Sequence, residues 1–215
     1  MPIVFTFVGD PVSLGLIESL ARPGGQVTGF TNFEYSIGGK WLELLKEIDP
    51  RLGRVAVIMN AHNRGSSLYV PLIEEAGRSL SVGVSTAPVR NASEIENAIT
   101  AYAQPGSGLI VLPDSLAVTN RHLIIELAAR HRLPVIYPTS NFTTAGGLIS
   151  YGIDWQETYR QAASYVDRIL RGAKPAELPV QTPTKFELVI NVKSARSLGI
   201  AVPHSLLGRA NEVIE

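Results

Sequence analysis

Hydrophobic and polar positions follow two different rhythms along the chain. Short continuous apolar runs alternate with segments in which apolar residues recur three or four positions apart. The runs are typical of strands buried on both faces of a parallel sheet, and the wider spacing is typical of amphipathic helices. The clearest strand is 54–60 (RVAVIMN), and the clearest helix covers 39–48. We predict strands over 3–8, 26–32, 54–60, 83–88, 109–112, 134–137, 148–151 and 186–191, and helices over 13–21, 39–48, 66–81, 93–103, 117–132, 155–171, 193–198 and 203–210.

Helix start and stop signals support several of these bounds. Arg22-Pro23-Gly24-Gly25 is a strong stop after 13–21, and Gly172 stands where a C-terminal capping glycine belongs. Ser93 with Glu96 three residues later has the spacing of a capping box. Three prolines between Lys174 and Thr184 predict an extended connector there.

The order of the elements predicts the fold class. Strands and helices alternate as βαβαβα, which indicates an α/β fold with parallel sheets flanked by helices. Residues 54–150 form a self-contained doubly wound unit. The remainder contributes two long strands, at 3–8 and 186–191. These strands either extend the one sheet or belong to an incomplete second lobe.

Composition narrows the function classes. Of the 215 residues, 45% are hydrophobic and 18% charged, and 19 Lys+Arg balance 19 Asp+Glu, so charge gives no case for nucleic acid or an anionic membrane. No apolar run approaches the roughly 20 residues that span a bilayer. Cysteine is absent, and the four histidines are not paired at metal-ligand spacing. We therefore expect a globular chain with no metal and no cofactor.

Common catalytic motifs are missing from the sequence. There is no GxGxxG after a strand, no GxxxxGK[ST], no GxSxG and no HExxH. Gly24-Gly25 and Gly146-Gly147 fit turns at helix ends better than phosphate loops. We expect no enzyme and no catalytic residue. An α/β enzyme acting through Asp10 or Asp114 is a minor alternative, because it would lack a paired base, a nucleophile and a cofactor loop.

Polar residues gather directly after the predicted strands, where open α/β sheets bind ligands. Each of them also suits a helix cap or a turn, because Asp, Ser and Asn are preferred there. Five such loops at one sheet edge favour a polar cleft for a small polar solute, with helix amides for a carboxylate and an Asp for an ammonium group. We predict ligand-binding roles for Asp10, Asn60, Asn63, Ser66, Ser67, Asp114, Ser115, Tyr137 and Asp154.

Three long stretches resemble a known family. They are FVGDPVSLGLIESLARPGGQVTGFTN, GGKWLELLKEIDPRLGRVAVIMN and GGLISYGIDWQETYRQAASYVDRILRGAKPAELPVQTPTKFELVINVKSARSLGI. They are similar to the substrate-binding components of ABC importers, in the group that includes tryptophan/tyrosine-type binding proteins. The resemblance implies a type I periplasmic-binding fold, with two α/β lobes joined by three crossover strands and a ligand held between the lobes.

Laid on this chain, the resemblance implies a complete lobe two over 34–151 and a partial lobe one, with crossover segments, over 1–33 and 152–215. Members of the family usually carry a signal peptide and further strands of lobe one before the position of Met1. Because a bare sheet edge favours pairing, we expect a second copy of the chain to cover it, giving a homodimer.

The resemblance also implies the function and the location. The chain is expected to bind a small solute in the periplasm without catalysis, with an amino acid as the leading candidate, and to deliver it to ABC permease subunits. Within lobe two, we expect the 60–67 loop to cradle a carboxylate and Asp114 to meet a cation or hydroxyl. Tyr137, with Tyr151 and Trp155, is expected to form an apolar wall or part of the core. The alternative is a cytosolic ligand-sensing domain of a regulator with the same fold.

Overall fold

A computed structural model of the chain describes residues 1–31, 34–63 and 65–215, without the Phe7 side chain. Asn32, in a predicted strand, and Arg64, in the loop after 54–60, lie outside the described residues. The chain forms two compact units. Unit 1 consists of Met1–Glu34 and Ile153–Phe186, and unit 2 consists of Tyr35–Gly152 and Glu187–Glu215. Both units have the α/β character that the element order predicts.

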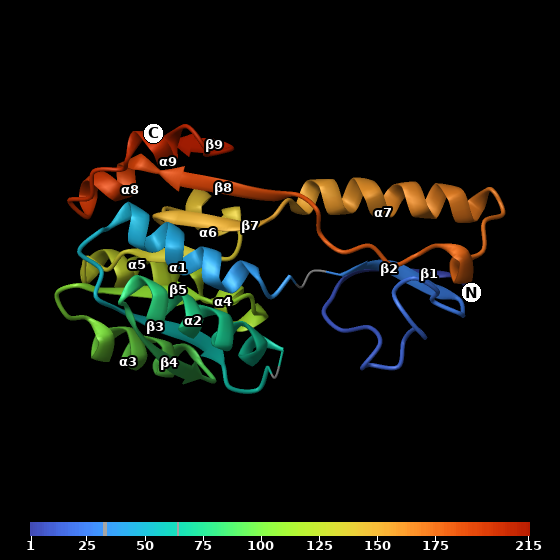
Figure 1. Ribbon diagram of the computed structural model, residues 1–215, viewed down its shortest axis with the longest axis horizontal. Coiled ribbons are helices and arrows are strands. Elements are labelled where there is room, and N and C mark those ends of the chain that lie inside the picture. Colours follow the sequence, from blue (N-terminus) through green and yellow to red (C-terminus); the bar gives the residue numbers. More distant parts are fainter. Residues whose placement is uncertain (32–33, 64) are drawn as a thin grey trace. The chain divides into compact units, whose positions relative to one another are not determined.

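Unit 2 is built on a seven-stranded sheet with the order β4-β3-β5-β6-β7-β8-β9 (Figure 1). The neighbours of β3, the β5–β6 and β6–β7 pairs and the β8–β9 pair are parallel. Parallel strands in this order need helical crossovers on both faces. The strands are β3 (Arg54–Asn60), β4 (Gly83–Val89), β5 (Ser107–Val111), β6 (Val135–Tyr137), β7 (Ile149–Ile153), β8 (Phe186–Asn191) and β9 (Glu212–Ile214).

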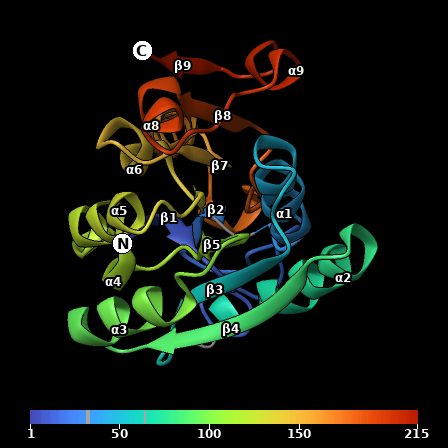
Figure 2. The ribbon, with the colours of Figure 1, turned by 90° about the vertical axis from the view of Figure 1, so that its left-hand side faces the viewer.

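Helices cover both faces of this sheet. Figure 2 shows α1 and α2 on one face and α3, α4 and α5 on the other. Strand β3 feeds both layers, because alternate side chains of a strand point to opposite faces. Its Ala56 and Ile58 belong to the core under α3 and α5, which also holds Ile95, Ile124 and Phe142. The helices are α1 (Ile37–Ile48), α2 (Val70–Leu80), α3 (Ala92–Tyr102), α4 (Ser115–Thr119), α5 (Arg121–Arg130), α6 (Ser140–Thr144), α8 (Val192–Ser197) and α9 (His204–Leu207), with a 3-10 turn, η1 (Ser66–Tyr69).

Unit 1 is smaller and has a two-stranded sheet. Strand β1 (Ile3–Val8) pairs in parallel with β2 (Val27–Thr31), and α7 (Trp155–Leu170) packs against both. The Phe30 and Tyr165 rings lie 4.8 Å apart between β2 and α7. The proline-rich connector predicted over 174–184 holds a short 3-10 turn, η2 (Pro175–Glu177), and then runs beside β2, where the Gln181 amide donates to the Gly29 carbonyl at 3.0 Å. This is the extended segment that the prolines indicate.

The division of the chain differs from the sequence-based one after residue 186. We placed all of 152–215 with the N-terminal unit, but 187–215 belongs to unit 2. The physical reason is hydrogen bonding, since β8 joins the large sheet next to β7 and β9 pairs with β8. The Asn191 amide donates to the Leu148 carbonyl at 2.9 Å, which fixes β8 in that sheet. Of the two long strands predicted outside 54–150, β8 therefore extends the large sheet, whereas β1 pairs with β2.

Three local predictions are wrong. Residues 13–21 form turns and bends rather than a helix, because Gly15 has φ +69° and the Asp10 carboxylate accepts the Ser13 amide at 3.0 Å. The helix predicted over 117–132 divides at Asn120 into α4 and α5. The cap of α3 is Asn91, which accepts the Glu94 amide, rather than Ser93 with Glu96.

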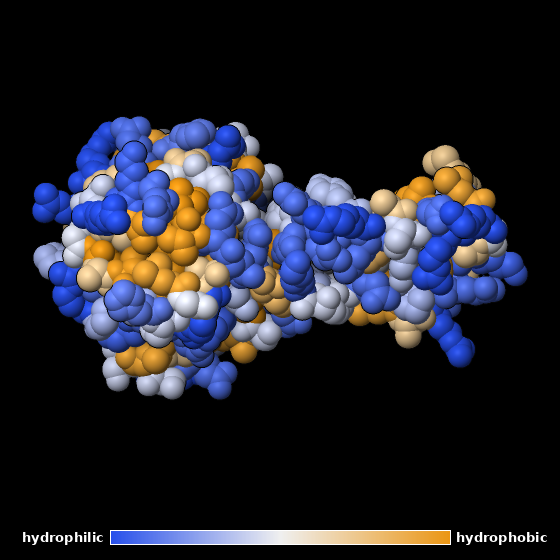
Figure 3. Space-filling view, turned by 90° about the horizontal axis from the view of Figure 1, so that it is seen from above, coloured by the Kyte–Doolittle hydropathy of each residue, from blue (hydrophilic) through white to orange (hydrophobic). Residues whose placement is uncertain are grey.

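Hydrophobic residues also reach the surface of both units (Figure 3). Most of the large exposed ones lie in unit 1, where Leu14 is 66% and Leu170 81% exposed. Over the described residues, none of the helices combines the length and apolar character that a bilayer crossing needs.

Candidate functional site

Two loops at the carboxyl end of the large sheet meet through one carboxylate. Strands β3 and β5 are neighbours in parallel register, so Asn60 at the end of one lies near Asp114, which follows the other. The Asn60 side-chain amide donates to Asp114 Oδ1 at 2.9 Å, and the Asn63 amide donates to Asp114 Oδ2 at 2.8 Å. The structure thus brings together three of the predicted ligand-binding residues. With Ser66 they are called the Asn60–Asp114 cluster below.

Asp114 has a third bond of its own. Its Oδ1 also accepts the Leu116 backbone amide at 2.7 Å, and this bond caps α4. A carboxylate offers about four acceptor positions, so three bonds leave about one for another donor. Asp114 therefore holds two loops together and keeps limited capacity for a cation or hydroxyl. The capping role that the sequence offered as an alternative is also present.

The loop after β3 turns back on its own side chains. Asn60 Oδ1 accepts the His62 amide at 2.9 Å, and Asn63 Oδ1 accepts the Gly65 amide at 3.0 Å. These Asx turns are the local reason why Asn occupies both positions. They leave each amide nitrogen to bind Asp114. The loop is thus folded by the same two residues that orient the carboxylate.

Ser66 is the residue of the cluster with an unused group. It is fully buried at the start of η1, and among the described residues its Oγ finds no hydrogen-bond partner. A buried hydroxyl without a partner is costly, so it is suited to a ligand or a water. Ser67, one residue on, and Ser115, at the start of α4, are both exposed.

Tyr137 is not part of this cluster. It ends β6, but its ring is 1% exposed and stacks on Phe142 at 4.9 Å in the core. Burial raises the pKa of its hydroxyl. Of the two roles open to it in the sequence, wall of the polar cleft or core, the structure gives Tyr137 the second.

Two predicted residues belong to unit 1. Asp10 is exposed and accepts both the amide and the hydroxyl of Ser13, which lower the pKa of its carboxyl. Asp154 caps α7 by accepting the Glu157 amide at 2.9 Å and pairs with Lys185 at 3.1 Å. The bond to Glu157 is the main cause that lowers the pKa of Asp154, and Lys185 adds to it.

An aromatic group beside η1 escaped the sequence analysis. The Tyr69 ring lies 5.1 Å from the Tyr35 ring and 5.1 Å from the Trp41 ring. Trp41 is held by a bond from its Nε1 to the Tyr151 carbonyl at 2.7 Å. Apolar spacing marked Trp41 as a helix-face residue, but no pattern indicates that the three rings meet near Ser66. In the part of the chain that the structure describes, no three His, Cys, Asp or Glu side chains are grouped as metal ligands.

Comparison with known proteins places this geometry in a family. A sequence model of the ABC transporter substrate binding protein family matches residues 1–214. The chain belongs to this family. Its fold is the type I periplasmic-binding fold, as the resemblance of the three stretches implies.

Longer relatives support the assignment. The tyrosine-binding protein of Clostridioides difficile (strain R20291) is 28% identical over 92% of this chain, which spans 57% of that relative. Among solved structures, an ABC domain in complex with L-Trp from Streptococcus pneumonia has a TM-score of 0.86 and 25% identity, with 99% of this chain and 73% of that chain covered. A conserved domain protein from Vibrio cholerae has a TM-score of 0.87 and 30% identity over 99% of this chain and 71% of its own.

Proposed function

We propose that this chain binds a small solute, an amino acid, at the Asn60–Asp114 cluster, without catalysis. The observation that carries the proposal is that Asp114 keeps about one free acceptor position while it holds the Asn63 loop. In the same loop, the Ser66 backbone amide donates to the Asn63 carbonyl at 3.1 Å, and the buried Ser66 hydroxyl has no partner among the described residues. An α-ammonium group would take the remaining position on Asp114, and an α-carboxylate would accept from Ser66. This is the division of tasks that the sequence predicts for the loop and for Asp114.

The aromatic group supports the choice of solute. Tyr35 is half-buried and meets Tyr69 edge-on, at an interplanar angle of 66°, next to the loop that holds Ser66. Aromatic rings prefer such edge-on contacts with further rings. A solute with an aromatic side chain therefore suits this end of unit 2 better than a small aliphatic one. The relative named as a tyrosine-binding protein and the similar structure in complex with L-Trp agree with this choice.

Titration calorimetry with L-tyrosine, L-tryptophan and L-alanine tests the proposal. We expect the aromatic amino acids to bind more tightly than alanine. Asp114→Ala should raise their dissociation constants about tenfold or more, because hydrogen bonds to charged groups contribute roughly 1.5–3 kcal/mol. Asp114→Asn removes the charge with little change of shape, so it separates loss of charge from loss of the loop. Glu126→Gln, at an exposed position of α5, is the matched control.

Two results contradict the proposal. One is the absence of heat with all three amino acids under conditions in which the chain is folded. The other is a dissociation constant that is unchanged in both Asp114→Ala and Ser66→Ala.

Single alanine variants in the same titration test the remaining predicted residues, which are Asp10 and Asp154 in unit 1 and Asn63, Ser67 and Ser115 in unit 2. Chemical conversion of a bound amino acid, followed by mass spectrometry, would contradict the non-catalytic part.

The proposed partners follow from the family. We infer that the chain binds its solute in the periplasm and delivers it to ABC permease subunits of the cytoplasmic membrane. We also infer that a second copy of the chain covers apolar side chains of unit 1, among them Val166 and Leu170 on α7. Light scattering of the purified chain measures this directly, and a monomer mass at every concentration would refute the homodimer.

A further inference from the structure

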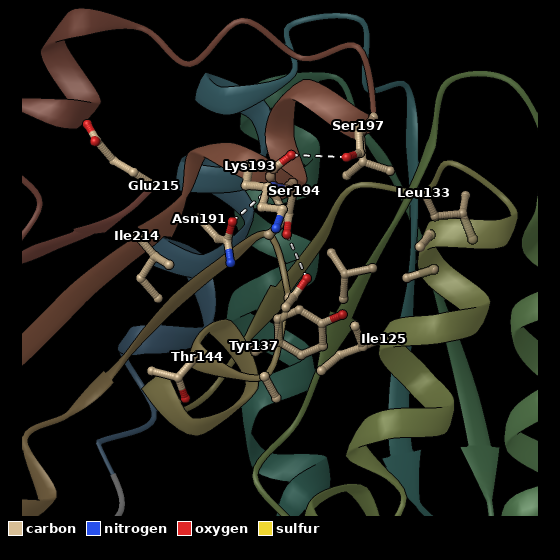
Figure 4. A pocket seen from close by; sticks show the side chains of 18 residues that line it. Ile125, Leu133, Tyr137, Thr144, Asn191, Lys193, Ser194, Ser197, Ile214 and Glu215 are labelled. Carbon is tan, nitrogen blue, oxygen red and sulfur yellow. Dashed lines mark hydrogen bonds between the residues drawn. The ribbon is translucent and has the colours of Figure 1, made fainter.

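A cavity opens in unit 2, among residues that the proposed amino-acid site does not use. Its volume is about 460 Å³, which is within the range of small-molecule pockets. It lies between α5, α6, β6 and the C-terminal elements α8 and β9 (Figure 4). It is called the Tyr137 cavity here. Its lining includes Ile125, Leu133, Val135, Tyr137, Leu148, Asn191, Lys193, Ser194, Leu198 and Ile214.

The inner end of this cavity has one unused polar group. Tyr137 is 1% exposed, and none of the described residues forms a hydrogen bond with its hydroxyl. The ring is fixed from two sides, by stacking on Phe142 and by Gly147, where a Cβ would come 2.5 Å from Tyr137 Cε2. Because burial raises the pKa of the hydroxyl, it stays protonated and can both donate and accept.

The other polar side chains of the cavity are already bonded. Ser194 Oγ donates to the Gly146 carbonyl at 2.7 Å, and Asn191 donates to the Thr143 carbonyl at 3.2 Å. Figure 4 shows Asn191 and Ser194 on the side of α8, with their bonds within the wall. These groups shape the cavity, and they leave Tyr137 as the deep position for a ligand's polar atom.

The outer end carries a charge. Lys193 lines the cavity and is exposed, and none of the described carboxylates forms an ion pair with it. Glu215 brings a carboxylate to the same lining, but Figure 4 shows it turned away from Tyr137. Between the two ends the wall is apolar, with Leu133 at 2% and Leu148 at 3% exposure. The cavity therefore has a cationic rim, an apolar middle and a neutral hydroxyl at its inner end.

We infer that the Tyr137 cavity binds a hydroxyaryl carboxylate. The aromatic ring would fill the apolar middle, the carboxylate would meet Lys193 at the rim, and the aryl hydroxyl would bond to Tyr137. The ligand meant here is one without an ammonium group, unlike tyrosine, so it lacks the feature for which Asp114 is proposed. The two sites take different ligands, and this inference does not depend on the proposed function.

The test compares 4-hydroxyphenylacetate with phenylacetate, which lacks only the aryl hydroxyl. Titration of the ¹⁵N-labelled chain is expected to shift the amide signals of Gly146, Gly147 and Ser194. Tyr137→Phe should raise the dissociation constant of 4-hydroxyphenylacetate about fivefold and leave that of phenylacetate within about twofold, because only one of them loses a hydrogen bond. Tyr102→Phe, which packs against the same core outside the cavity lining, is the matched control.

Lysine substitution tests the rim. Lys193→Gln should raise the dissociation constants of both probes about threefold, since both carboxylates lose the same exposed ion pair. Arg196→Gln, on the same helix, should change neither dissociation constant. Absence of shifts at Gly146, Gly147 and Ser194 with both probes overturns the inference. The inference also fails if Tyr137→Phe, shown to be folded by circular dichroism, weakens the binding of both probes equally. It fails too if Asp114→Ala weakens the binding of either probe, because that result would place the probe at the other site.

Discussion

The two units cover their apolar residues to different extents. In unit 2, helices on both faces of a seven-stranded sheet bury side chains completely, as at Leu42, Ile73 and Ile95. In unit 1, two strands and α7 enclose a small core around Phe30, while Leu170 of the same helix is 81% exposed. A small two-stranded unit buries less apolar surface to offset its chain entropy than a large sheet covered by helices does. We infer from this difference that unit 2 contributes most of the free energy of unfolding of the chain.

The largest effects are expected from matched core truncations. Leu42→Ala in α1 should lower the free energy of unfolding of unit 2 by about 3 kcal/mol, because a fully buried leucine leaves a cavity. Leu178→Ala removes the same atoms from unit 1, where Leu178 is 2% exposed in a small cluster that can close more easily. We expect a smaller loss there, about 2 kcal/mol.

The two tryptophans of the chain report on these variants separately. Trp41 lies in unit 2 and Trp155 in unit 1, so urea unfolding followed by fluorescence in Trp155→Phe and Trp41→Phe backgrounds measures one unit at a time. Unit 1 should unfold at lower urea than unit 2. A single transition at the same midpoint for both reporters would show that the units unfold together, and the comparison would fail.

A smaller effect separates the two units by pH. Asp154 caps α7 in unit 1, and Asn91 caps α3 in unit 2, each by accepting one backbone amide at 2.9 Å. Replacement of either by alanine should cost about 1 kcal/mol at neutral pH. Only Asp154 titrates, and the pKa of its carboxyl is lowered in the folded state.

The sign of the pH dependence follows from that direction. A lowered pKa means that the cap contributes fully above the ordinary value of 3.8, and that the contribution is lost as pH falls through the folded-state value. The difference between wild type and Asp154→Ala should therefore shrink in acid, while that of Asn91→Ala should not change. Thermal unfolding between neutral pH and pH 3 measures both. An acid-independent Asp154→Ala difference would contradict the assignment of the cap to the ionised form.

Strong apolar patterns predicted most helices and strands of unit 2. Local hydrogen bonds that compete with a continuous helix explain the wrong predictions at 13–21 and at Asn120. The run 54–60 and the apolar spacing of 39–48 correspond to β3 and α1 because burial on a sheet dictates both patterns. Residues 13–21 have helical spacing, but Gly15 at positive φ and the bonds from Ser13 to Asp10 favour a turn. At Asn120, the side chain donates to the Leu116 carbonyl at 2.8 Å, beside the break between α4 and α5.

The candidate site could be predicted only in part. The rule that ligands bind at the carboxyl ends of parallel strands was enough to select Asn60 and Asp114 from different loops. It does not indicate that these side chains bond to each other, because that depends on the distance between β3 and β5. It also does not tell which way Tyr137 points, since a strand-end residue can face either the cleft or the core. The stacking of Tyr137 on Phe142 of α6, the next element along the chain, decides the second question, and no periodicity in the sequence indicates that contact.

The smallest expected effect concerns the exposed side of α7. Trp155, Tyr159, Val166 and Leu170 lie within one narrow stripe of this helix and are each at least 39% exposed. In an isolated chain, Val166→Lys and Leu170→Lys should change the free energy of unfolding by less than about 0.5 kcal/mol, as for other surface positions. Val213→Lys, at an exposed apolar position of unit 2, is the matched control.

The same variants also test whether a second copy of the chain covers unit 1. If a second copy covers the stripe, the Val166→Lys/Leu170→Lys double variant should convert a dimer mass to a monomer mass in light scattering, while Val213→Lys should leave it unchanged. A loss of stability well above 0.5 kcal/mol that appears only at high protein concentration would have the same meaning, because association stabilises the folded state by mass action. A monomer with unaltered stability in every variant would instead mean that no second copy covers Val166 and Leu170, and that unit 1 tolerates their exposure.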